Sequence, residues 1–149
     1  MVEEKIIEVL SGNAQKNALK FISFLRENEI LLEANNEGDG WAVGGVVGNS
    51  MGYMIVNGGA QELWLWFNDC DFETGASVDD ELKEFVWAQV SPCGKCHDGW
   101  EKCGGGTRVI FGKEFERLCH SPLMFTNFES DKLENIKKLM LILKRKWGA

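Results

Sequence analysis

Four apolar runs of strand length follow one another in the first half of the chain and set the expected architecture. They occupy residues 29–34, 41–47, 51–56 and 62–67. Clusters rich in Asn and Gly separate these runs at residues 35–40, 48–50 and 57–60, and such clusters favour tight turns. Apolar runs joined by short turns are typical of hairpins, so the pattern predicts an antiparallel sheet.

The alternation of side chains within two of these runs distinguishes the two faces of the expected sheet. In the second run, Ala42 and Gly44 share one side, which is therefore nearly bare backbone that a helix or a ligand can approach closely. In the fourth run, Trp64 and Trp66 alternate with leucines and a phenylalanine, so both sides are apolar. We expect this strand to be central and covered on both sides, or to line a pocket on one side.

Apolar residues recur at helical spacing in four other stretches. These are residues 4–11, residues 14–28, residues 81–88 and a long segment from residue 131 towards the C-terminus. Asn13 and Ser77 are placed to cap the second and third of these helices, and Asp131 with Glu134 forms a capping-box pattern in the fourth. The preceding region is expected to hold two strands, over residues 107–111 and 122–128, and a short helical or turn segment over residues 113–118.

Length and composition indicate one folded domain. The chain has 149 residues, of which 44% are hydrophobic and 26% charged, as in ordinary globular proteins. It contains no linker, internal repeat or low-complexity tract. We therefore predict a single α+β domain over residues 1–149, in which an antiparallel sheet of four to six strands is packed by amphipathic helices.

Charge is unevenly distributed along the chain and limits the expected partners. The net charge is −7; residues 1–90 contribute −11 and residues 91–149 contribute +4. The acidic part would repel nucleic acid. The start of the chain lacks signal-peptide features and no run approaches 18 apolar residues, so we expect a cytoplasmic protein that does not enter a membrane. The basic residues of the last helix are most simply a solvated face: Lys132, Lys137, Lys138, Lys144, Arg145 and Lys146.

Four of the five cysteines and both histidines lie between residues 93 and 120. The cysteines are Cys93, Cys96, Cys103 and Cys119. Because Zn²⁺ prefers four thiolate or imidazole ligands, and a Cys-x2-Cys turn presents two sulfurs to one metal, this spacing predicts a structural zinc site. The four thiolates are the preferred ligand set, although His97 or His120 can replace one of them.

Three other interpretations of the cysteines remain open. Cys93 and Cys96 form a dithiol turn like that of disulfide oxidoreductases, which predicts a thiol-based redox enzyme or sensor. With His97 the same residues match the covalent haem-attachment pattern, which is unfavourable without an export signal. Ordinary unligated thiols are the third interpretation.

The last 60 residues or so also carry a resemblance to known proteins. The spacing of the four cysteines, together with Phe111-Gly112-Lys113 and Phe115 between the third and the fourth, resembles a group of small uncharacterised bacterial proteins with a Cys-x2-Cys…Cys…Cys signature. The resemblance implies a metal-binding knuckle on Cys93, Cys96, Cys103 and Cys119. It implies no activity.

Aromatic residues supply a second candidate site. Four of them fall on neighbouring predicted strands: Trp41, Tyr53, Trp64 and Trp66. If these rings converge on one side of the sheet, they and the carboxylate of Glu62 can hold a small apolar or cationic ligand. The alternative is that the rings are simply an aromatic core.

The sequence contains no set of catalytic residues that would indicate a particular reaction. Nucleophilic triads need a histidine base, and both histidines adjoin cysteines of the expected metal site. The leading hypothesis is a non-enzymatic, zinc-containing module that binds or senses a small ligand, similar in general design to the effector-binding domains of bacterial regulators. The alternatives are redox chemistry at Cys93 and Cys96 and a protein-interaction module that uses the basic last helix. The sequence does not indicate an oligomeric state.

Overall fold

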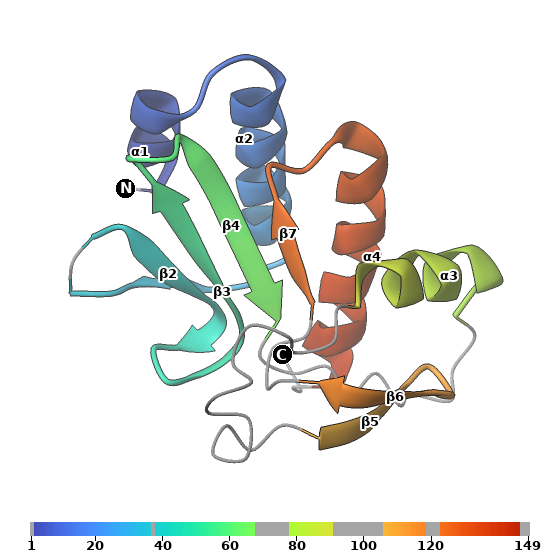
Figure 1. Ribbon diagram of the computed structural model, residues 1–149. Coiled ribbons are helices and arrows are strands. Elements are labelled where there is room, and N and C mark those ends of the chain that lie inside the picture. The colour runs from blue at the N-terminus through green and yellow to red at the C-terminus, as the bar shows by residue number, and fades with distance from the viewer. Residues whose placement is uncertain (1, 37, 68–77, 91–105, 119–122, 147–149) are drawn as a thin grey trace.

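The structure of the protein is a computed structural model that describes residues 2–36, 38–67, 78–90, 106–118 and 123–146 (Figure 1). Helices and antiparallel strands make up these residues, so the predicted α+β class is confirmed. The helices are α1 (Val2–Val9), α2 (Gly12–Glu27), α3 (Asp80–Gln89) and α4 (Ser130–Lys146). The strands are β1 (Leu32–Ala34), β2 (Gly40–Val46), β3 (Asn49–Asn57), β4 (Glu62–Phe67), β5 (Gly106–Ile110), β6 (Lys113–Leu118) and β7 (Met124–Thr126).

Five strands form the main sheet in the order β1-β2-β3-β4-β7, within the predicted range of four to six strands. The first four strands follow the chain order, as expected for successive hairpins, and each pairs antiparallel with the next. Strand β7 arrives from far along the chain and pairs with β4, where Leu65 lies opposite Phe125. Strand β4 is therefore an interior strand, as its apolar sequence predicted.

One face of this sheet packs against the helices and forms the core. In Figure 1, α1 and α2 lie behind β3 and β4, and α4 runs beside α2. Phe21 of α2 makes an edge-on contact with Phe128, with ring centroids 5.1 Å apart. The buried Asn17 side chain donates a hydrogen bond to the Phe128 carbonyl at 2.8 Å, so the one buried amide of α2 is satisfied where α2 meets the segment before α4.

A separate hairpin, β5 and β6, packs beside α3. The Trp87 indole N–H of α3 donates to the Ile110 carbonyl at 2.7 Å, and the Lys113 amine lies 5.4 Å from the centre of the Trp87 ring. The prediction of a helical or turn segment over residues 113–118 is wrong, because these residues form β6. The strands are joined by Phe111 and Gly112, both with positive φ (49° and 83°), as in a tight hairpin turn. A phenylalanine in this conformation is uncommon, which concealed the turn.

The predicted helix caps also differ from the structure. Helix α2 begins at Gly12 with Ser11 in the N-cap position, so Asn13 does not cap it. Helix α3 is capped by Asp79, whose side chain accepts a hydrogen bond from the Leu82 N–H at 2.7 Å. The predicted cap, Ser77, lies outside the described residues. None of the described helices is both long enough and apolar enough to cross a bilayer.

Candidate functional site

Strand β4 presents apolar residues to both faces of the sheet, and the two sets differ in exposure. Leu63, Leu65 and Phe67 are at most 1% exposed and face the helices. Trp64 and Trp66 point to the opposite face and are partly exposed. The alternation that puts successive side chains on opposite sides of a strand therefore divides β4 into a core side and an accessible side.

The accessible side continues across the neighbouring strands. Tyr53 of β3 lies opposite Trp66, and Ile55 lies opposite Trp64. On the other side of β4, Met124 of β7 pairs with Trp66 and is 53% exposed. We call this surface the aromatic face; it consists of Tyr53, Ile55, Trp64, Trp66 and Met124.

The rings of the aromatic face are close enough to act together. The ring centroids of Tyr53 and Trp66 are 5.5 Å apart with an interplanar angle of 40°. Trp64 follows on the same side of β4, where residues two apart are separated by about 7 Å along the strand. A flat or compact apolar group can therefore contact more than one ring at once.

Tyr53 is held in place by groups outside the aromatic face. The Asn35 side-chain amide donates a hydrogen bond to the Tyr53 hydroxyl at 2.7 Å, and the Asn35 side-chain carbonyl accepts one from the Gly38 N–H at 2.8 Å. A Cβ atom on Gly40 would overlap the Tyr53 hydroxyl, so the phenol lies directly over bare backbone of β2. The orientation of the Tyr53 ring is thus fixed before any ligand arrives.

The carboxylate of Glu62 lies at one end of this surface. Glu62 opens β4, pairs with Asn57 and shares the side of the strand that carries Trp64 and Trp66. Its neighbour on that side is Trp64, two residues away. A negative group next to an indole ring is an arrangement that suits a positively charged ligand.

The structure brings together four of the five residues predicted from the sequence for ligand binding and separates the fifth. Tyr53, Glu62, Trp64 and Trp66 share one side of the sheet. Trp41 pairs with Met54 on the helix side, is only 7% exposed and belongs to the core. The sequence analysis missed Asn35, Ile55 and Met124; of these, only Ile55 had a signal, since it alternates in step with Tyr53.

The predicted zinc ligands cannot be placed in the same way. Cys93, Cys96, Cys103 and Cys119 all lie outside the described residues, as do His97 and His120. Within the described ranges, no three His, Cys, Asp or Glu side chains are grouped so that they could hold a metal ion. The described residues nearest in sequence to Cys103 and Cys119 are Gly106 and Leu118, which pair across the β5–β6 hairpin.

Three of the six basic residues of α4 have polar partners within the described part of the chain. The Lys138 amine lies 3.6 Å from the Asp79 carboxylate, and the Lys137 amine lies 3.2 Å from that of Glu134. The Lys144 amine donates a hydrogen bond to the Asn28 carbonyl. These contacts favour the interpretation of α4 as a solvated, packed helix over that of a basic docking surface.

Comparisons of the chain with known proteins found no match. No family model matches the chain, and no curated protein or solved structure matches it at a significant level. The candidate site therefore rests on its own geometry.

Proposed function

We propose that the protein is a non-enzymatic module that binds or senses a small apolar or cationic ligand on the aromatic face. The observation that carries this proposal is the row of partly exposed rings of Tyr53, Trp66 and Trp64 that ends at the carboxylate of Glu62. Large aromatic side chains that stay partly exposed in a well-packed domain form a surface that can gain free energy by covering a partner.

The chemistry of the row favours a ligand with an apolar body and a positive charge. Indole is the best cation–π acceptor among side chains, and such a contact contributes about 0.5–1 kcal/mol at an exposed site and about 2 kcal/mol when the cation is desolvated. Glu62 adds a full negative charge beside Trp64. Because Asn35 already fixes the Tyr53 ring, little conformational entropy is lost on binding.

Zinc is part of the same proposal, as a structural ion on Cys93, Cys96, Cys103 and Cys119. The β5–β6 register supports it, since Gly106 lies three residues after Cys103 and its partner Leu118 directly precedes Cys119. Three residues span at most about 11 Å, so the hairpin limits how far apart these two cysteines can be. A metal bound there would connect the chain between α3 and β7.

Ligand binding is tested by titration with benzyltrimethylammonium, followed by protein tryptophan fluorescence and by thermal stability. We expect saturable binding that weakens several-fold in Trp64→Leu and in Glu62→Gln, because these changes remove a ring face and the nearby charge. Glu114→Gln is the matched control, since it removes an equal charge from an exposed site on β6.

Two results would contradict the proposed binding. The first is the absence of any saturable change on titration with benzyltrimethylammonium or with a neutral aromatic such as benzyl alcohol. The second is binding that Trp64→Leu and Glu62→Gln leave intact, which would assign the ligand to another surface.

The metal is tested by elemental analysis of protein that is purified reduced and without added metal. We expect about one zinc per chain, and less in both Cys93→Ser and Cys119→Ser. Metal-free protein in which Cys93 and Cys96 oxidise reversibly would overturn the zinc assignment and favour the redox hypothesis instead.

A further inference from the structure

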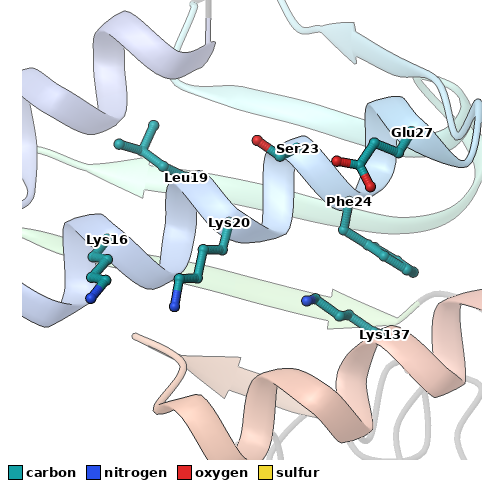
Figure 2. A pocket seen from close by; sticks show the side chains of 7 residues that line it. All are labelled: Lys16, Leu19, Lys20, Ser23, Phe24, Glu27 and Lys137. Atoms are coloured by element: carbon teal, nitrogen blue, oxygen red, sulfur yellow. The ribbon is translucent and has the colours of Figure 1, made fainter.

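A groove runs between α2 and α4, on the helix layer and away from the aromatic face. Its cavity has a volume of about 490 Å³, within the range of small-molecule sites. The lining residues are Lys16, Leu19, Lys20, Ser23, Phe24 and Glu27 of α2 and Lys137 of α4. Figure 2 shows Lys16 and Lys20 pointing from α2 towards α4, and Lys137 pointing back from α4.

Lys16 and Lys20 lie one helical turn apart on α2. Neither amine makes an ion pair or a hydrogen bond within the described part of the chain. Like charges four residues apart on a helix repel each other and slightly destabilise it. Only five of the first 90 residues are basic, against 16 acidic ones, so two lysines next to each other on one helix face are unusual in this part of the chain.

The remaining groups define where an anion would sit. A second cavity, of about 280 Å³, adjoins the same two lysines and is also lined by Asn13, Asn17, Glu129 and Ser130. Among the residues that line this second cavity, Glu129 carries the one negative charge, and Lys16 and Lys20 carry two positive charges. Glu27 lies seven residues beyond Lys20 along α2, about 10 Å away, so the positive end of the groove is at Lys16 and Lys20.

Lys137 of α4 and Phe24 of α2 meet across the groove and combine charge with an apolar surface. The Lys137 amine lies 5.6 Å from the centre of the Phe24 ring and 3.2 Å from the Glu134 carboxylate, which is 68% exposed. Phe24 is partly buried and packs against the core. The groove therefore offers two unpaired amines, a third amine shared with an exposed carboxylate, and one aromatic ring.

We propose that this groove binds a small polyanion that carries at least two phosphate or carboxylate groups. Lysine is a common point-charge ligand for such groups, and two unpaired amines one turn apart match two neighbouring negative groups. The volume fits a small molecule. This site is independent of the aromatic face, so its failure would leave the proposed function intact.

The test is calorimetric titration of the whole protein with tripolyphosphate and with citrate, at constant ionic strength. We expect saturable binding of at least one of them, with the dissociation constant raised about tenfold or more in a Lys16→Gln/Lys20→Gln double variant, since a hydrogen bond to a charged group contributes about 1.5–3 kcal/mol. Lys83→Gln, which removes one lysine from α3, is the control and should bind as the unmodified protein does.

The thermal stability of the ligand-free double variant separates binding from folding. It should be unchanged or slightly higher, because the repulsion between the two amines is gone. Binding that the double variant retains, or the absence of saturable binding of either anion, would overturn the proposal. Binding of an acidic peptide without binding of either small anion would also overturn it, in favour of a protein partner.

Discussion

The two faces of the main sheet are both apolar at β3 and β4, yet the helices of the described part of the chain pack on only one of them. On the helix side, Met54, Leu63 and Leu65 are at most 1% exposed. On the aromatic face, Tyr53 and Trp66 remain partly exposed, although they follow the same alternation along the same strands. The difference shows that apolar patterning alone does not decide which surface is the core; the helices that pack on it do.

The largest effect is expected when a buried side chain on the helix side of β4 is shortened, which tests the difference between the two faces. Leu65→Ala should lower the free energy of unfolding by about 2–5 kcal/mol, because it leaves a cavity in a closed core. Urea denaturation measures this loss. Trp64→Leu on the other side of β4 should cost less, although it deletes more atoms. Equal losses would mean that the aromatic face is as tightly packed as the core.

Bare backbone in β2, at Gly44, is the next feature to test. Gly44 has φ +71°, and a Cβ atom there would overlap the buried Met51 side chain. Gly44→Ala should therefore cost about 1–3 kcal/mol of unfolding free energy. Gly48→Ala is the control, since Gly48 also has positive φ (+93°) but faces open space. If both variants lose the same unfolding free energy, the cause is the strained backbone at positive φ and not an overlap with Met51.

The anchoring of Tyr53 should have a smaller effect on stability. Tyr53→Phe removes the acceptor of the Asn35 hydrogen bond and should lower the free energy of unfolding by about 0.5–1.5 kcal/mol. It should also weaken benzyltrimethylammonium binding, because the ring is no longer fixed. Unchanged binding would show that the preset orientation of the ring does not matter for the ligand.

The smallest effect is expected from charge pairing in the helix layer. Arg26 of α2 holds the Glu3 carboxylate of α1 through two hydrogen bonds of 2.8 and 2.9 Å, which lowers the pKa of Glu3 below its usual value. The pair therefore stabilises the fold above the ordinary glutamate pKa of about 4.3, and this contribution is lost as the pH falls further through the lowered pKa.

Glu3→Gln should cost less than about 1 kcal/mol at neutral pH, since the pair is partly exposed. Thermal unfolding at a series of pH values should show the difference from the unmodified protein shrinking below about pH 4. Glu8→Gln on the same helix serves as the control. A larger loss would indicate that charges, and not the apolar core, attach α1 to α2.

Much of the fold followed from local patterns. Strand β4 was predicted with its observed bounds, the helix over residues 14–28 matches α2 closely, and the long helix expected from residue 131 matches α4. Strand β6 was missed because its turn depends on an unusual backbone conformation at Phe111. Local sequence patterns could not predict that β7 pairs with β4, because the two strands are separated by more than 50 residues.

The aromatic site shows where sequence reasoning ends. The pattern of alternation identified Tyr53, Trp64 and Trp66 as candidates, since residues two apart on a strand share a face. It could not exclude Trp41, because which side a residue takes relative to the next strand depends on the register, and Trp41 turned out to pair with Met54 on the core side.

By itself, the sequence determined the α+β class, the main helices, the hairpins of the first four strands and the cysteine spacing that suggests zinc, because each of these is encoded in residues close together in the chain. Only the tertiary structure decided which face of the sheet the helices cover, that Asn35 fixes Tyr53, and that Lys16, Lys20 and Lys137 line one groove. Such features depend on contacts between residues far apart in sequence, which alternation and helical periodicity do not specify.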